Sequence, residues 1–188
     1  DGPTHQPVEH EAQIRLLEKL QNHHGKNSML VLRPADVHET TVAWKMAMEN
    51  SKTPTGLILS RQNIKDLPAS EQSRFSEALK SEKGAYIVQD DPGYDVILLA
   101  SGSEVATLVE GADLLRADGV KVRIVSVPSE GLFRAQSSEY QDSVLPEGKK
   151  KFGLTAGLPV TLEGLVGADG AVWGMTSFGF SAPYKVLD

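Results

Sequence analysis

The chain has 188 residues, of which 40% are hydrophobic and 23% charged, a composition typical of an ordinary soluble globular protein and not of a disordered one. Its net charge of -6 gives no basic surface for nucleic acid, and no apolar run approaches the length of a membrane span, so we expect neither nucleic acid nor a membrane as a partner. Cysteine is absent, which excludes a disulfide scaffold, a thiol nucleophile and any cysteine-ligated metal, and fits a cytoplasmic protein.

The first segment predicts a loop followed by a helix. The chain begins Asp1-Gly2-Pro3 without an initiator methionine, which favours a processing site, a cloning boundary or the first ordered residue, and suggests a fragment. From Val8 onward the apolar residues recur at helical spacing, and this pattern predicts one buried face. Its members are Val8, Ala12, Leu16 and Leu20. The segment 22–25 (NHHG) then ends the helix with a glycine cap.

A strand, a helix and a second strand are predicted next. Residues 29–32 form a continuous apolar run, as in a strand buried on both faces of a parallel sheet. Asp36 followed by Glu39 has the spacing of a capping box, so we expect a helix from there to about Glu49. The residues expected on its buried side are Ala43, Trp44, Ala47 and Met48. With a strand at residues 55–60, the short connections predict a parallel crossover unit.

A polar stretch over residues 65–83 predicts a linker with a helical turn or two, after which strands and helices alternate again. The predicted strands are residues 85–89, 95–100, 120–127, 151–155 and 171–175, and the predicted helices begin at Ser101 and Ser138. We therefore expect an α/β protein of two three-layer units, with parallel or mixed sheets flanked by helices. The first unit has too few strands to complete its sheet.

Two segments carry candidate binding residues. In the segment DGPTHQP, Asp1 and His5 lie on a proline-pinned loop and offer an acceptor and a donor to a polyhydroxylated ligand, although the same loop also fits a surface segment rich in turn formers. Arg61 follows a predicted strand, where ligands of open parallel sheets bind, and its guanidinium suits a phosphate. The alternative is an arginine solvated at a sheet edge.

The turn Ser101-Gly102-Ser103-Glu104 opens a predicted helix and is a weaker candidate. Free backbone N–H groups at such a turn bind anions. Ser101 and Glu104 also have capping-box spacing, and the carboxylate would compete with an incoming anion, so we favour simple capping. The adjacent His23 and His24 lack the spacing of metal ligands, and we expect both to be exposed.

Several motifs together resemble the transketolase family, in the order in which that family has them. They are DGPTHQPVEH, LRPADVHET, VAWKMAMEN, PTGLILSRQN, ILLASGSEV, VRIVSVPS and SVLP. The resemblance implies that residues 1–80 are the carboxy-terminal half of the pyrimidine-binding domain and residues 84–188 the carboxy-terminal domain. It also implies that His5 and Asp1 contact sugar hydroxyls as catalytic-site residues and that Arg61 binds the sugar phosphate.

The family transfers a two-carbon ketol unit between ketose and aldose phosphates with thiamine diphosphate and a divalent metal, Mg, and its active site forms in a homodimer. The resemblance places no cofactor-binding or metal-binding residue in this chain, so we expect no cofactor bound to it and no activity of the chain alone. A non-catalytic binding or dimerisation module, or one chain of a split transketolase, remains the alternative. The preferred sugar phosphates do not follow from the sequence.

Overall fold

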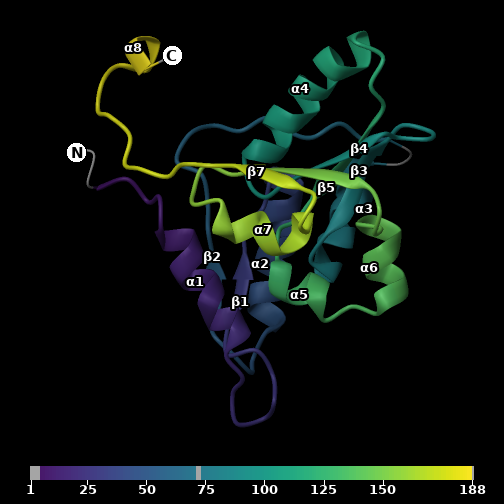
Figure 1. Ribbon diagram of the computed structural model, residues 1–188. Coiled ribbons are helices and arrows are strands. Elements are labelled where there is room, and N and C mark those ends of the chain that lie inside the picture. The colour runs from purple at the N-terminus through teal and green to yellow at the C-terminus, as the bar shows by residue number, and fades with distance from the viewer. Residues whose placement is uncertain (1–4, 71–72, 188) are drawn as a thin grey trace.

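A computed structural model describes residues 5–70 and 73–187, and its elements form two units that pack against each other (Figure 1). The first unit comprises α1 (His10–Lys19), β1 (Leu30–Leu32), α2 (Val37–Glu49) and β2 (Thr55–Leu57). Strands β1 and β2 are parallel, with Leu30 opposite Thr55 and Leu32 opposite Leu57. This pairing confirms the predicted crossover unit, and in the described residues its sheet has these two strands.

The polar stretch between the units contains two short helices, as predicted. They are α3 (Arg74–Ala78) and the 3-10 helix η2 (Leu79–Lys83). The strands of the second unit are β3 (Tyr86–Asp90), β4 (Val96–Ala100), β5 (Val122–Ser126), β6 (Lys150–Leu154) and β7 (Ala171–Trp173). Its helices are α4 (Glu104–Ala117), α5 (Glu130–Arg134), α6 (Ser138–Val144) and α7 (Val160–Val166), and α8 (Tyr184–Leu187) follows. The sheet order is β3-β5-β4-β6-β7, and β3 is the antiparallel edge strand of an otherwise parallel sheet.

Helices cover both faces of the second sheet, so this unit has three layers. Along β4, Leu98 and Ala100 point to a core completed by α4. Ile97 and Leu99 point to the opposite core, which α5, α6 and α7 complete. Figure 1 shows α4 on one side of the sheet and these three helices on the other. The alternation of side chains along a strand thus supplies both cores, and the mixed α/β fold is confirmed.

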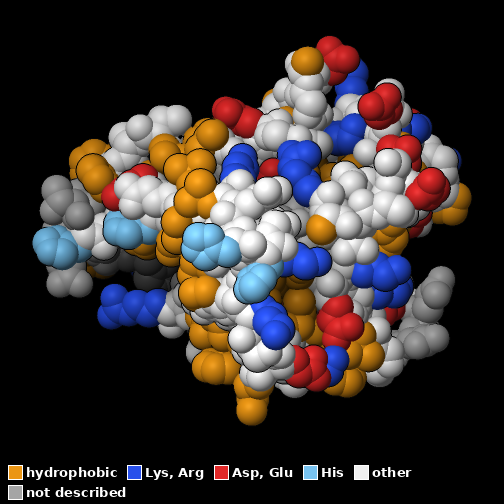
Figure 2. All heavy atoms as spheres, turned by 90° about the horizontal axis from the view of Figure 1, so that it is seen from below, with side chains coloured by type: hydrophobic (Ala, Val, Ile, Leu, Met, Phe, Trp, Pro, Cys, Tyr) orange, Lys and Arg blue, Asp and Glu red, His pale blue; other side chains and the backbone are white. Residues whose placement is uncertain are grey.

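Helix α2 begins at the predicted residue but buries a different face. The side chain of Asp36 accepts a hydrogen bond from the backbone N–H of Glu39 at 2.8 Å, which is the expected cap. Ala43 is buried as predicted, whereas Trp44 is 53% exposed and Met48 is 83% exposed. The prediction that these two side chains are buried was wrong. Figure 2 shows a band of hydrophobic side chains on the face seen from below. Hydrophobic side chains therefore lie on the exterior of the molecule as well as in its core.

Helix α1 follows the predicted pattern only in part: Val8, just before the helix, is buried as predicted, and Ala12 is partly buried. Leu16 and Leu20, which we expected on the buried face, are 60% and 58% exposed. The residues that α1 buries are Glu11, Arg15 and Glu18. Helices α5 and α7 were not predicted, since each is two turns or fewer and too short for a clear hydrophobic period. Within the described part of the chain, no helix is both long and apolar enough to cross a membrane.

Candidate functional site

A cleft of about 440 Å³ lies where the two units meet, at the carboxyl ends of strands from both sheets. From the first unit it is lined by Arg33, directly after β1, and by the segment 58–62, which follows β2. From the second unit it is lined by Ser103 and Glu104 after β4, by Ala156 and Gly157 after β6, and by Met175 after β7. The carboxyl edge of a parallel sheet is the usual binding side of open α/β folds, so this cleft is the candidate site.

Arg61, predicted from the sequence as a phosphate ligand, lines this cleft with an exposed side chain. Neighbouring Ser60 and Gln62 line it too. Among residues 5–70 and 73–187, no hydrogen bond or ion pair engages the Arg61 guanidinium. Its donors therefore remain available for a ligand in the cleft.

The loop that carries His5 borders the same cleft. Gln6 and Pro7 line the cavity, whereas His5 is exposed beside them and does not line it. The second unit holds this loop: the Gln6 side chain accepts a hydrogen bond from the Gly179 N–H at 2.6 Å and donates one to the Phe180 carbonyl at 3.3 Å. Asp1, the other predicted residue of this loop, lies outside the described residues.

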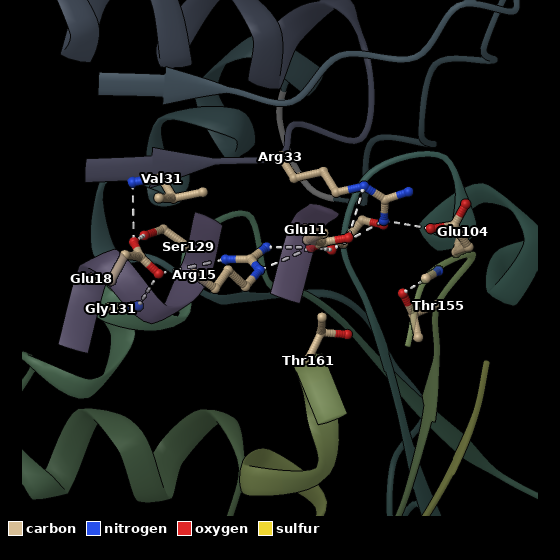
Figure 3. A network of polar contacts seen from close by, with 12 residues as sticks. Glu11, Arg15, Glu18, Val31, Arg33, Glu104, Ser129, Gly131, Thr155 and Thr161 are labelled. Atoms are coloured by element: carbon tan, nitrogen blue, oxygen red, sulfur yellow. Dashed lines mark hydrogen bonds and ion pairs between the residues drawn. The ribbon is translucent and has the colours of Figure 1, made fainter. Parts of the chain in front are cut away.

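Arg33 also lines the cleft, although the sequence did not single it out. Its Nη1 donates to the Ser101 carbonyl at 2.5 Å, to the Ser101 hydroxyl at 3.2 Å and to the Glu104 carboxylate. Its Nε lies 3.5 Å from a carboxylate oxygen of Glu11. Figure 3 shows the guanidinium between these two carboxylates. The signal that found Arg61, an arginine just after a parallel strand, applies equally to Arg33.

The turn Ser101-Gly102-Ser103-Glu104 therefore receives an arginine from the first unit. A Cβ on Gly102 would lie 2.8 Å from Cζ of Arg33, so glycine allows the guanidinium to lie against the turn. The predicted capping box is wrong: Ser103 occupies the N-cap position of α4 without a capping hydrogen bond, and the Glu104 carboxylate binds Arg33. Burial alone would lower the pKa of Arg33, but the Glu11 and Glu104 carboxylates outweigh it and raise this pKa, so the guanidinium stays charged.

A chain of buried charges on α1 continues from the cleft into the interface between the units (Figure 3). Glu11 binds Arg15, and the Glu18 carboxylate lies 3.7 Å from Nη1 of Arg15. Glu18 also accepts hydrogen bonds from the Val31 N–H at 3.1 Å, the Ser129 hydroxyl at 3.1 Å and the Gly131 N–H at 3.3 Å. Burial raises the pKa of Glu18, although Arg15 and these donors oppose the shift. Because its partners come from both units, Glu18 fixes α1 between them.

A second buried cluster joins the units at the start of α2. Glu39 accepts hydrogen bonds from the hydroxyls of Tyr86 at 2.6 Å and Ser126 at 2.8 Å, both in the second unit. Arg74 of the connecting segment donates to the Tyr86 hydroxyl at 2.6 Å and to Asp36 at 2.5 Å. Burial raises the pKa of Glu39. These contacts hold the two sheets in a fixed relation, and the cleft lies where the two units meet.

The described residues provide no donor set for a metal. Within residues 5–70 and 73–187, no group of three or more His, Cys, Asp or Glu side chains is arranged to hold a metal ion. His23 and His24 are exposed, as predicted. The cleft is equipped to bind polar groups of a ligand through hydrogen bonds and charge.

Two family profiles match the chain. The profile described as the transketolase-like carboxy-terminal domain matches residues 84–188, and that of the transketolase pyrimidine-binding domain matches residues 1–66. Transketolase 2 of Vibrio parahaemolyticus is 42% identical over 189 residues, which cover 100% of this chain and 26% of the relative. The chain therefore spans about a quarter of the length of the curated relatives it matches.

Solved structures agree with these matches. The transketolase from Leishmania mexicana superposes with a TM-score of 0.83 at 38% identity, over 100% of this chain and 25% of that one. A transketolase of Pichia stipitis in complex with sedoheptulose-7-phosphate superposes with a TM-score of 0.82 at 34% identity, again over 100% and 25%.

Proposed function

The chain belongs to the transketolase family, and we propose that it serves as the carboxy-terminal part of an enzyme that transfers a two-carbon ketol unit from a ketose phosphate to an aldose phosphate. In this proposal residues 1–80 are the second half of the pyrimidine-binding domain and residues 84–188 the carboxy-terminal domain. The two profile matches support this division. The Pichia stipitis relative that binds sedoheptulose-7-phosphate supports sugar phosphates as substrates.

The observation that carries the proposal is the position of Arg61. Its exposed guanidinium lines a cleft whose volume, about 440 Å³, suits a small ligand, and it has no internal ion pair among the described residues. A planar guanidinium binds two phosphate oxygens at once. We propose that Arg61 holds the sugar phosphate at the mouth of the cleft.

His5 and Asp1 are proposed to bind hydroxyl groups of the same sugar. The loop that carries them is anchored to the second unit through the hydrogen bonds of Gln6. This anchoring supports a fixed position for His5 beside the cleft. Hydrogen bonds from such a loop would orient the sugar chain relative to the reacting carbon. Arg61 and His5 would then bind opposite ends of one substrate.

Thiamine diphosphate, bound with a divalent metal, would stabilise the carbanion of the transferred unit in the complete enzyme. The described residues do not fit a metal site, and we propose that both groups are held by other parts of the enzyme. This chain would bind and orient the sugar phosphate, as part of a cytoplasmic homodimer of the pentose phosphate pathway. By itself it would be inactive, and full turnover by the purified 188-residue chain would contradict this.

The proposal is tested by calorimetric titration of the purified chain with ribose 5-phosphate. Arg61→Ala should weaken binding about 10- to 100-fold, since hydrogen bonds to charged groups contribute about 1.5–3 kcal/mol. Lys80→Ala is the control, because it removes one exposed positive charge outside the cleft. Unphosphorylated ribose should bind the wild type and Arg61→Ala equally.

If Arg61→Ala binds ribose 5-phosphate as tightly as Lys80→Ala, the phosphate assignment is wrong. If the purified chain binds no sugar phosphate, the same three variants are compared by KM in the complete transketolase. A binding or dimerisation module would show no effect of Arg61→Ala in either assay. A split transketolase would regain turnover when this chain is mixed with the chain that completes it.

A further inference from the structure

The cleft contains a second arginine whose surroundings differ from those of Arg61. Arg33 and Arg61 both follow strands of the same parallel sheet and both line the cavity. Arg61 is exposed, whereas the Arg33 side chain is 11% exposed and lies between the Glu11 and Glu104 carboxylates. One arginine is therefore open to a charged ligand and the other is already compensated within the protein.

Arg33 nevertheless keeps one donor group for a ligand. Its Nη1 is engaged by Ser101 and Glu104, and its Nε faces Glu11. Its Nη2 has no hydrogen-bond partner in residues 5–70 and 73–187, and it is not among the buried unpaired atoms there. Figure 3 shows this terminal nitrogen without a contact to the other residues drawn. Since Arg33 lines the cavity, the exposed part of its guanidinium offers the N–H groups of Nη2 to the cleft.

The local charge determines which ligand atom suits this donor. The Glu11 and Glu104 carboxylates surround the Arg33 guanidinium, and Glu11 also pairs with Arg15, so the charges at this end of the cleft compensate one another. The exposed Arg61 guanidinium has no such partner in the described residues, so the Arg61 end is positive and is the end that attracts a phosphate. A hydroxyl group fits, because its oxygen accepts from Nη2 while its proton is donated to the Glu104 carboxylate, which also lines the cleft.

The second unit holds this arrangement rigidly. Gly102 has a φ of +65° and lies so close to Arg33 that a Cβ added at this position would be 2.8 Å from Cζ of Arg33. The Ser103 hydroxyl donates to the second oxygen of Glu104 at 2.7 Å. Donor and acceptor are therefore fixed before any ligand binds, which lowers the entropic cost of binding.

We propose that Arg33 and Glu104 form a hydroxyl-binding subsite, built jointly by the two units, which takes uncharged oxygen atoms of the sugar chain while Arg61 takes the phosphate. The inference rests on the proposed transketolase function and adds to it. It gives the second unit a direct part in substrate binding, and it orients the sugar chain within the cleft from the charge-compensated end at Arg33 to the positive end at Arg61.

The experiment compares variants of the complete transketolase with ribose 5-phosphate and with ribose as acceptors. Arg33→Lys keeps the positive charge but removes Nη2, and Glu104→Gln removes the carboxylate. Each should lower kcat/KM about 10-fold for both acceptors, so that the preference for the phosphorylated sugar is unchanged. Arg61→Ala should instead lower kcat/KM for ribose 5-phosphate alone. Glu110→Gln is the matched control, since Glu110 lies exposed on the same helix and pairs with Lys65.

A second measurement excludes a merely structural effect of these variants. Acceptors that lack single hydroxyl groups are compared on the unmodified enzyme and on Arg33→Lys. One missing hydroxyl should cost the unmodified enzyme about 10-fold in kcat/KM and cost Arg33→Lys nothing, because the partner of that hydroxyl is already absent.

The inference is overturned if Arg33→Lys and Glu104→Gln behave like Glu110→Gln, or if they impair only the phosphorylated acceptor. It is also overturned if the hydroxyl effects are the same in the unmodified enzyme and in Arg33→Lys. In these cases the proposed function stands, provided that Arg61→Ala still removes the preference for phosphate. Absence of ketol transfer by the unmodified complete enzyme would overturn the proposed function and this inference with it.

Discussion

Replacing Tyr86 with phenylalanine would remove one hydroxyl group from the buried cluster that joins the two units, and nothing else. The hydroxyl donates to Glu39 at 2.6 Å and accepts from Nη2 of Arg74 at 2.6 Å. Burial raises the pKa of Tyr86, so the hydroxyl keeps its proton and remains the donor to Glu39. The ring itself is 1% exposed and stays in place in the variant, so no cavity forms.

The expected loss follows from these two hydrogen bonds. Each has a charged partner, and such bonds contribute about 1.5–3 kcal/mol. Glu39 keeps the Ser126 hydroxyl at 2.8 Å and Arg74 at 3.3 Å, so neither charged group is left without a partner. We therefore expect the lower end of the combined range, a loss of about 3 kcal/mol in the free energy of unfolding. For a chain of this size that lowers Tm by roughly 6–12 °C.

The assay is urea and thermal denaturation of the purified chain, followed by circular dichroism. Tyr140→Phe is the matched control, because the Tyr140 hydroxyl makes one neutral hydrogen bond, to the Ala85 carbonyl at 2.8 Å. Removing that bond should cost about 1 kcal/mol. Equal losses for the two variants would contradict this prediction, since they would mean that the charged groups Glu39 and Arg74 gain nothing from the Tyr86 hydroxyl.

Three further predictions use denaturation of the same purified chain. Gly102→Ala should destabilise the chain by about 1–3 kcal/mol more than Gly93→Ala, because both glycines have positive φ but only the added methyl at position 102 meets another side chain; equal losses would contradict this. The pKa of Glu18 is raised above 4.5 in the folded state, so its stabilising contribution is fully present below pH 4.5 and is lost as the pH rises through the folded pKa. The difference in free energy of unfolding between the wild type and Glu18→Gln should therefore shrink from pH 4.5 to pH 7. A difference that grows over this range would mean that the pKa of Glu18 is lowered in the folded state. Trp44→Ser should change the free energy of unfolding by about 0.5 kcal/mol or less, whereas Val42→Ala, in the core, should cost about 1–3 kcal/mol; the reverse order would restore the predicted burial of Trp44.

Features that depend on neighbouring residues could be predicted from the sequence. The start of α2 at Asp36 rests on a hydrogen bond between residues three apart, and its spacing is visible in the sequence. Helix α6 begins at Ser138 as predicted, and its cap is local, since the Ser137 side chain accepts a hydrogen bond from the Tyr140 N–H. The placement of Arg61 beside a cleft followed from its position after a strand, since parallel strands end at the same edge of a sheet.

The faces that helices bury depend on their partners and could not be predicted in this way. On α1 the apolar positions Leu16 and Leu20 are exposed, whereas Glu18 is buried because its hydrogen-bond donors come from β1 and from the start of α5. Those donors are 13 and 113 residues away in the sequence. A hydrophobic period identifies an apolar face, but it does not say which neighbour the helix meets.

By itself the sequence determined the order of the strands and of the helices α1, α2, α4 and α6, the α/β class, the family resemblance and the position of Arg61 after a strand of the first sheet. The tertiary structure alone decided the role of the turn Ser101–Glu104. Its spacing favoured a local cap, but Arg33, which binds Glu104 from 71 residues away, presents a full positive charge at short range. A charge-assisted bond in a buried site is stronger than a bond to a neutral backbone N–H, so the Glu104 carboxylate binds the distant Arg33 instead of capping the helix, and both side chains line the cleft.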